Sequence, residues 1–233
     1  ISVQEAIFSG DNARLKTQTG ADTFFSGGKD LYLTIDADVC AAAYDALNGH
    51  KGTVGVYNYK TGEIICMVSA PAYDPADPPV IEDGDETYDG VYINRLISST
   101  FTPGSTFKLM TVSTAYDLGA THAEDTYYCG GSLQVENWEI KCANTSGHGM
   151  QTLTEALMNS CNVAMMQIAQ SVGMDRFYNF YKAFGLTEPT GIDLPGEGKG
   201  QFHKLDVASD WNEVALATAS FGQRFTVTPI QML

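Results

Sequence analysis

Basic residues are scarce in this 233-residue chain, because 13 lysines and arginines stand against 28 aspartates and glutamates, a formal net charge of −15. This balance disfavours contact with phosphate backbones, so no nucleic acid is expected as a partner. No apolar run approaches the ~20 residues that a membrane helix needs. No basic start precedes a short apolar stretch, as a secretory signal would require. Apolar residues nevertheless make up 44% of the chain, which is enough for a buried core.

Cysteine pairs with the spacing of a zinc site are also missing, because none of the five cysteines belongs to a C-x-x-C motif. No metal site is therefore expected. Cys129 and Cys142 bracket the stretch GGSLQVENWEIK, whose alternation of apolar and polar residues predicts a short hairpin that brings its two ends together. A disulfide in an oxidising compartment and two free thiols both fit this arrangement.

Neither end of the sequence has the features of a natural terminus. Residues 1–28 are polar and contain glycine without clear periodicity, so they are interpreted as a linker or the tail of a preceding domain. The folded domain is expected to cover 29–233. At its end, Thr228 and Pro229 suit a helix cap and a first helical turn, and a helix that starts there has no room to finish. The sequence is therefore expected to be a piece of a longer protein.

Hydrophobic spacing predicts strands early in the domain and helices after residue 104. The expected strands are 30–36, 52–58 and 63–69, with a helix at 37–47. A proline-rich acidic stretch at 70–92 predicts an irregular loop. The expected later helices are 105–118, one that begins at the capping box of Thr152 and Glu155, 162–172 and 174–185. An antiparallel sheet with a helix on it, followed by a mostly helical part, defines an α+β fold.

Ser105 and Lys108 form an S-x-x-K motif at the start of a predicted helix. Residues three apart share a helix face, and a serine hydroxyl needs a base before it can act as a nucleophile. Apolar neighbours would lower the pKa of the lysine, because desolvation disfavours the ammonium. The N–H of Ser105 is free in the first turn and can stabilise an oxyanion. The alternative is that Ser105 only starts the helix and that Lys108 is solvated. The spacing alone is weak evidence, because S-x-x-K recurs at Ser26 to Lys29, where two glycines disfavour a helix.

A second candidate motif, S-x-N, is formed by Ser160 and Asn162 between two predicted helices. The hydroxyl can relay a proton, and the amide can hold Lys108 or a substrate carbonyl. Helix capping is the alternative role of both residues. The K-T-G sequence at 60–62 lies in a hairpin turn and is not expected to be catalytic. His148, between glycines, is interpreted as part of a turn rather than as a base.

Several stretches together resemble the transpeptidase domain of a penicillin-binding protein, most closely the class B, monofunctional kind. They are GKDLYLTIDADV, KTGEIICMVSAPAYDP, NRLISSTFTPGSTFK, GHGMQTLTEALMNSCN, GIDLPGE and SFGQRFTVTPIQML. The resemblance implies the penicillin-binding/serine β-lactamase-like fold. It also implies Ser105 as the acylated nucleophile, Lys108 as its general base, and Ser160 and Asn162 as residues that shuttle the proton and position the donor peptide.

The family's third motif, a K-T/S-G strand, comes well downstream of TPIQML, and the sequence stops before it. The C-terminal strands and one wall of the active site are therefore expected to be missing.

The resemblance implies a peptidoglycan D,D-transpeptidase that attacks the D-Ala-D-Ala end of a stem peptide and is acylated by penicillin and other β-lactams. Neither metal nor cofactor is expected, because nucleophile, base and proton relay are all side chains. The expected location is the extracytoplasmic face of the bacterial cell membrane, with the anchor outside this sequence and other cell-wall synthesis proteins as possible partners. Two alternatives stay open: a serine β-lactamase or β-lactam sensor of the same fold, and a non-catalytic fragment that lacks the third motif.

Overall fold

The computed structural model describes residues 32–81, 86, 88–201 and 213–233. The expected linker at 1–28 and the second S-x-x-K copy at Ser26 lie outside these residues, and so does the expected boundary at residue 28. The described residues belong to two compact units. The first comprises the part of the chain up to Ser99 together with 190–198 and 228–233, and the second comprises 100–189 and 199–227.

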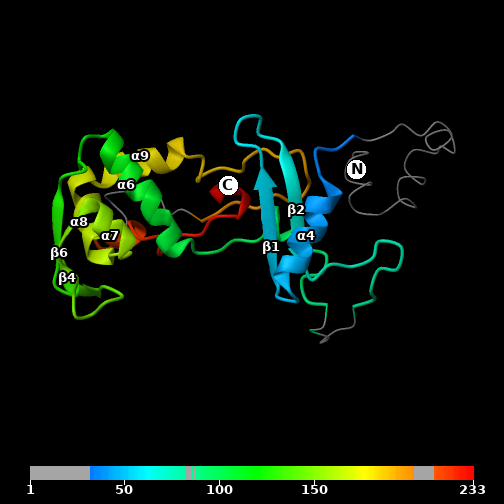
Figure 1. Cartoon of the computed structure of the whole chain (residues 1–233), viewed down its shortest axis with the longest axis horizontal. Helices are drawn as coiled ribbons and strands as arrows, with labels where there is room; N and C mark the ends of the chain where they lie inside the picture. The colour runs from blue at the N-terminus through cyan, green and yellow to red at the C-terminus, as the bar shows by residue number, and fades with distance from the viewer. Residues whose placement is uncertain (1–31, 82–85, 87, 202–212) are drawn as a thin grey trace. The chain divides into compact units, whose positions relative to one another are not determined.

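In the first unit a helix packs on a two-stranded antiparallel hairpin (Figure 1). Strand β1 (Gly52–Tyr57) pairs with β2 (Ile64–Ala70). Helix α4 (Ala37–Leu47) begins where the Asp36 carboxylate accepts hydrogen bonds from two backbone N–H groups, and ends at Asn48 in the left-handed conformation (φ 47°). The predicted helix and hairpin are therefore confirmed.

The strand expected at 30–36 is not formed in its described part, residues 32–36. This segment runs beside the start of β2 with one backbone hydrogen bond, from Asp36 N–H to Ile65 O at 2.8 Å. The Thr34 hydroxyl adds a bond to Ile64 O at 2.6 Å. A single backbone bond does not make a ladder, so alternation alone predicted a strand that has no paired neighbour here.

Two short helices complete the first unit, α5 (Arg95–Ser98) and the 3-10 helix η2 (Ile230–Met232). The predicted cap at the start of η2 is present, because the Thr228 N–H donates to Gln231 Oε1 at 2.9 Å and the Gln231 N–H donates to Thr228 Oγ1 at 3.4 Å. The described residues of the expected loop after β2 are turns and irregular chain.

The second unit is built around one buried helix, α8 (Asn162–Val172), in which seven of the eleven residues are buried. Among the described residues, four helices contact it: α6 (Lys108–Asp117), α7 (Leu153–Met158), α9 (Met174–Ala183) and α10 (Glu213–Ala219). The bounds of α8 match the prediction because its apolar residues follow helical spacing and a glycine at 173 ends it.

Two strand pairs and a short helix border these helices in the second unit (Figure 1). Their bounds are β3 (Thr126–Cys129), β4 (Ser132–Val135), β5 (Trp138–Lys141), β6 (Gly149–Thr152) and α7 (Leu153–Met158). Strand β3 pairs with β6, and β4 with β5, all antiparallel. The β4–β5 pair is the hairpin predicted between Cys129 and Cys142, and the capping box that starts α7 is present with both of its hydrogen bonds.

The combination of helices with antiparallel strands confirms the predicted α+β class. Among the described residues, no helix is both long and apolar enough to cross a bilayer.

Candidate active site

Ser105 lies in a 3-10 turn, η1 (Gly104–Phe107), that runs directly into α6 at Lys108. The Lys108 N–H donates to Ser105 O, so the two motif residues are joined by one turn of backbone. The first N–H groups of such a turn have no partner within the helix, which leaves the Ser105 N–H available to an oxyanion. The Ser105 side chain is exposed, whereas Lys108 is 2% exposed. The nucleophile candidate therefore faces solvent while its base candidate is buried.

The nucleophile turn is anchored on both sides. Phe107 is fully buried and meets the rings of Tyr181 and Phe225 edge to face, with centroid distances of 5.1 and 4.8 Å. The Gly104 N–H donates to Gly222 O at 2.9 Å. Gly222 has φ +78°, and a Cβ there would lie 2.1 Å from Gly104 O. Only glycine permits this approach, so Gly222 helps to fix the position of η1.

The structure brings the two predicted motifs together through the lysine. Lys108 Nζ lies 2.6 Å from Ser160 O, 2.9 Å from Ser160 Oγ and 2.7 Å from Asn162 Oδ1. The three contacts span more than fifty residues of sequence and saturate the nitrogen. All three partners come from the S-x-N motif.

These contacts suit both protonation states of Lys108. A carbonyl and an amide oxygen can only accept hydrogen bonds, whereas the Ser160 hydroxyl can also donate. The ammonium donates to all three oxygens. The neutral amine donates to Ser160 O and Asn162 Oδ1 and accepts from the Ser160 hydroxyl. Burial lowers the pKa of Lys108 from its ordinary value of 10.5, and negative charge on Cys142 and Cys161 opposes that change.

The break between α7 and α8 explains how Ser160 and Asn162 reach Lys108. Ser160 adopts a left-handed conformation with φ 48°, which ends α7 and turns its carbonyl toward the lysine. The capping roles weighed for the motif fall to its neighbours, since Asn159 is the C-cap of α7 and Cys161 is the N-cap of α8. Ser160 and Asn162 are thereby free to contact the lysine.

Other residues considered from the sequence lie elsewhere. The K-T-G sequence at 60–62 forms the β1–β2 turn, as expected. Cys129 and Cys142 are both buried free thiols, so the structure has no disulfide between them. His148 precedes β6 and approaches Cys142, with 3.8 Å between Nδ1 and Sγ. Sequence spacing gave no indication of this contact.

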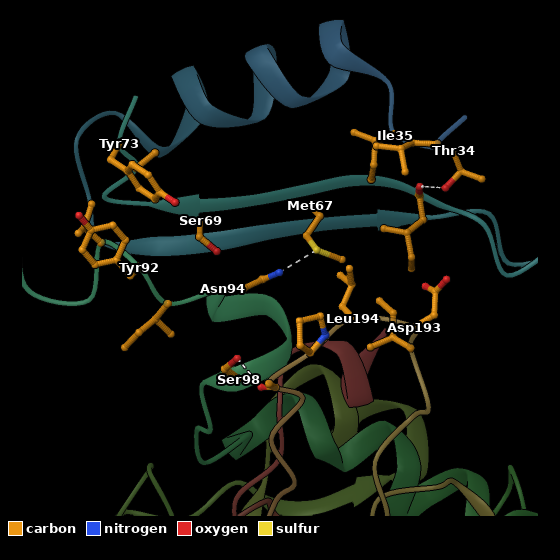
Figure 2. A pocket seen from close by; sticks show the side chains of 18 of the residues that line it. Thr34, Ile35, Met67, Ser69, Tyr73, Tyr92, Asn94, Ser98, Asp193 and Leu194 are labelled. Carbon is orange, nitrogen blue, oxygen red and sulfur yellow. Dashed lines mark hydrogen bonds between the residues drawn. The ribbon is translucent and has the colours of Figure 1, made fainter. Parts of the chain in front are cut away.

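A separate cavity of about 860 Å³ lies within the first unit, and no residue of the S-x-x-K or S-x-N motif lines it. Figure 2 shows the Asn94 amide pointing at the Met67 sulfur in its wall, with 3.0 Å between Asn94 Nδ2 and Met67 Sδ. The Ser98 hydroxyl in its wall donates to Gly196 O at 2.6 Å. The cavity walls therefore offer amides and hydroxyls already engaged with the protein, and no serine–lysine pair.

Solved structures define the class of fold. The Pseudomonas aeruginosa PBP2 structure in complex with WCK 5153 superimposes with a TM-score of 0.79 at 27% identity, covering 88% of this chain and 50% of that one. The Helicobacter pylori PBP2 structure, at 23% identity, gives a TM-score of 0.76 over 85% of this chain and 40% of that one. The chain has the fold of penicillin-binding proteins.

Family membership follows from the sequence match. The penicillin binding protein transpeptidase domain model matches residues 52–233, and the chain belongs to this family, as predicted. Stage V sporulation protein D of Bacillus subtilis (strain 168) is 34% identical over 215 residues, 88% of this chain and 32% of that protein. Peptidoglycan D,D-transpeptidase FtsI of Escherichia coli (strain K12) is 30% identical over 87% of this chain and 34% of its own length. The chain thus spans about a third of the length of these relatives.

Proposed function

We propose that the protein is a serine-type peptidoglycan D,D-transpeptidase in which Ser105 is the nucleophile and Lys108 its general base. The observation that carries the proposal is the trio of hydrogen bonds from Lys108 Nζ to Ser160 and Asn162. A buried lysine with a lowered pKa, held one helical turn from an exposed serine, supplies a base for that serine.

In the first half-reaction, the Ser105 hydroxyl attacks the carbonyl carbon of the peptide bond between the two terminal D-Ala residues. Its proton passes to the lone pair of neutral Lys108, which becomes free when the Ser160 hydroxyl turns its hydrogen away, and the Ser105 N–H stabilises the oxyanion. Collapse of the tetrahedral intermediate breaks the C–N bond, and the departing D-Ala amine takes up the proton through the Ser160 hydroxyl, which contacts Lys108. An acyl-enzyme and free D-Ala result.

In the second half-reaction, an amine of a neighbouring stem peptide attacks the acyl-enzyme and regenerates the Ser105 hydroxyl, with the proton returned along the same path. A β-lactam enters the same first step. Its C–N bond opens within a ring, so the amine stays attached to the acyl group and blocks the acceptor amine. Penicillin is therefore expected to remain bound to Ser105.

The proposal extends to the setting of the protein. Its substrate is the peptidoglycan stem peptide, its site of action is the extracytoplasmic face of the bacterial membrane, and other cell-wall synthesis proteins are its partners. Residues 29–233 are proposed as its transpeptidase domain, preceded by a linker at 1–28.

The test is the intact mass of the chain after incubation with penicillin. We expect one adduct, its loss in Ser105→Ala and its retention in Ser26→Ala, which removes the hydroxyl of the other S-x-x-K copy. An adduct that hydrolyses within one catalytic cycle would favour a β-lactamase instead. The absence of any adduct on a folded chain would favour a non-catalytic fragment and overturn the proposal for this stretch of sequence.

A further inference from the structure

Four side chains that the proposed chemistry does not use meet in the second unit. They are Cys129, Cys142, His148 and Cys161, and their ligand atoms all lie within 4.8 Å of one another. Cys142 Sγ lies 3.8 Å from His148 Nδ1 and 4.0 Å from Cys161 Sγ. The three cysteines are buried and the histidine is half-buried. We call these four residues the Cys3His cluster.

The fold assembles the Cys3His cluster from four separate segments. Cys129 is the last residue of β3, and it pairs with Gly149, so His148, which directly precedes β6, lies close to it. Cys142 directly follows β5, and its N–H donates to Gly131 O at 2.8 Å. Cys161 caps α8. Cys129 and Cys161 are thus positioned by β3 and α8, while Cys142 and His148 stand at the two ends of the connection between β5 and β6.

Two glycines allow the loops that carry the ligands to cross in close contact. Gly131 has φ +97°, and a Cβ there would lie 2.1 Å from Thr145 O. Gly147 has φ +82°, and a Cβ there would lie 2.4 Å from Cys129 O. Larger residues would separate these loops and pull Cys129 away from the residues that follow Cys142. The backbone is therefore built for the close approach of the four ligands.

Hydrogen-bond donors face two of the sulfur atoms, while burial raises the pKa of the Cys161 thiol to about 11 in the metal-free site. Backbone N–H groups of residues 144, 162 and 163 point to the Cys142 sulfur, and the Ala164 N–H donates to Cys161 Sγ at 3.4 Å. Gln151 is buried, and its Oε1 accepts from Asn159 Nδ2 at 3.1 Å. Its Nε2 has no hydrogen-bond partner in the described part of the chain, and the Gln151 side chain acts to lower the pKa of the Cys161 thiol, against the larger effect of burial. Donors of this kind support metal-bound thiolates.

We propose that Cys129, Cys142, His148 and Cys161 bind one Zn²⁺ ion in a closed tetrahedral site. Zinc bonds of about 2.3 Å to sulfur and about 2.0–2.1 Å to nitrogen place tetrahedral ligand atoms roughly 3.5–3.8 Å apart. The observed separations of 3.8 to 4.8 Å need a contraction of at most about 1 Å. Three thiolates and one imidazole match the ligand preference of zinc over calcium or magnesium. Binding releases the three thiol protons to solvent, while His148 binds as the neutral imidazole.

The position of Cys161 gives the zinc a consequence for the active site. Cys161 lies between Ser160 and Asn162, the two residues that contact Lys108 Nζ. A metal bond to its sulfur would fix the break between α7 and α8 and with it the S-x-N motif. The four ligands then act as positioning residues and take no part in bond making at Ser105.

The test is the zinc content of the purified chain, measured without penicillin, so that its outcome is independent of the proposed transpeptidase activity. The chain is prepared in a thiol reductant with added zinc sulfate, freed of unbound metal and analysed by elemental mass spectrometry. We expect about one zinc per chain, reduced to a small fraction in Cys129→Ser and in His148→Ala. Matched controls are Cys66→Ser, a buried thiol in the first unit, and His122→Ala, an exposed histidine of the same unit as the cluster, and both should retain the metal.

A second measurement serves if the ligand variants do not fold. The wild-type chain is stripped by a chelator and refilled with Co²⁺, and intense absorption of tetrahedral thiolate-bound cobalt is expected, together with a higher melting temperature than the stripped chain. A folded wild-type chain without zinc overturns the proposal in either of two ways. In the first, all cysteines are alkylated, which shows that the cluster holds free thiols only. In the second, the intact mass is lower by two hydrogens, which shows that two of its cysteines form a disulfide.

Discussion

At the scale of single residues, Lys108 links every part of the proposed site. Its backbone is bonded to Ser105, and its side chain to Ser160 and Asn162. Sequence spacing identified Ser105 and Lys108 because both lie in one helical turn. The same spacing could not establish that Lys108 is buried or that it contacts Asn162, because both depend on packing between α6 and α8, which are distant in sequence.

Replacement of Lys108 tests its role as the base. Lys108→Met keeps much of the side-chain volume but removes the proton acceptor, so acylation of Ser105 by penicillin should slow by about 10²–10⁴-fold. The second-order acylation rate constant, followed by intact mass over time, is the measurement. Lys60→Met, in the K-T-G turn, is the matched control and should leave the rate unchanged. Equal rates in both variants would remove Lys108 from the mechanism.

The pH dependence of acylation follows from the same lysine. Only neutral Lys108 can accept the Ser105 proton. Burial lowers the pKa of Lys108 below 10.5, and this effect is larger than the opposing effect of Cys142 and Cys161. The acylation rate should therefore rise with pH and level off at a pH below 10.5. Stopped-flow measurement with a chromogenic cephalosporin across that range gives the profile. A rate that falls as pH rises would show that the ammonium form is the active one.

At the scale of elements, local signals were sufficient wherever the element is defined by its own residues. The spacing and caps of α4 and α8 and the alternation of β4 and β5 predicted them well. The strand expected at 30–36 failed because a strand needs a paired neighbour, which alternation cannot supply. The Cys3His cluster was missed for a related reason. Its ligands are 13, 6 and 13 residues apart, and strand pairing with a helix break brings them together.

The contact between Gly222 and η1 leads to a prediction at this scale. Gly222→Ala places a Cβ 2.1 Å from Gly104 O in a left-handed backbone, so both stability and the position of Ser105 should suffer. Gly119→Ala is the matched control, because Gly119 also has positive φ (+65°) but a Cβ there meets nothing within 4 Å. Both variants should lose about 1–2 kcal/mol of unfolding free energy from the left-handed conformation.

Only Gly222→Ala should also slow acylation by penicillin, because only this variant pushes against the turn that carries Ser105. Urea unfolding gives the stability, and the acylation rate at a pH where both variants are folded gives the effect on the site. If Gly119→Ala slows acylation as much as Gly222→Ala, general destabilisation rather than the contact with Gly104 accounts for the loss.

At the scale of the whole molecule, the proposed functions are unevenly distributed. The S-x-x-K and S-x-N motifs and the Cys3His cluster all belong to the second unit, whereas the large cavity belongs to the first. The sequence predicted one domain over 29–233 because composition gives no sign of a division there. The division depends on which segments contact one another, since the chain returns to the first unit at 190–198 and again at 228–233.

This distribution predicts where acylation stabilises the protein. The residues proposed to act on a β-lactam bound to Ser105 all belong to the second unit, and a bound ligand suppresses the local opening of the segments that hold it. Amide hydrogen exchange measured by mass spectrometry should therefore slow in peptides from 104–118 and 157–165 of the acylated chain. Peptides from α4, β1 and β2 should exchange at unchanged rates. As a control, Ser105→Ala incubated with the same penicillin should show no change in exchange in any peptide. Equal protection of α4, β1 and β2 in the acylated wild type would contradict the prediction and would mean that the two units open together in one cooperative step.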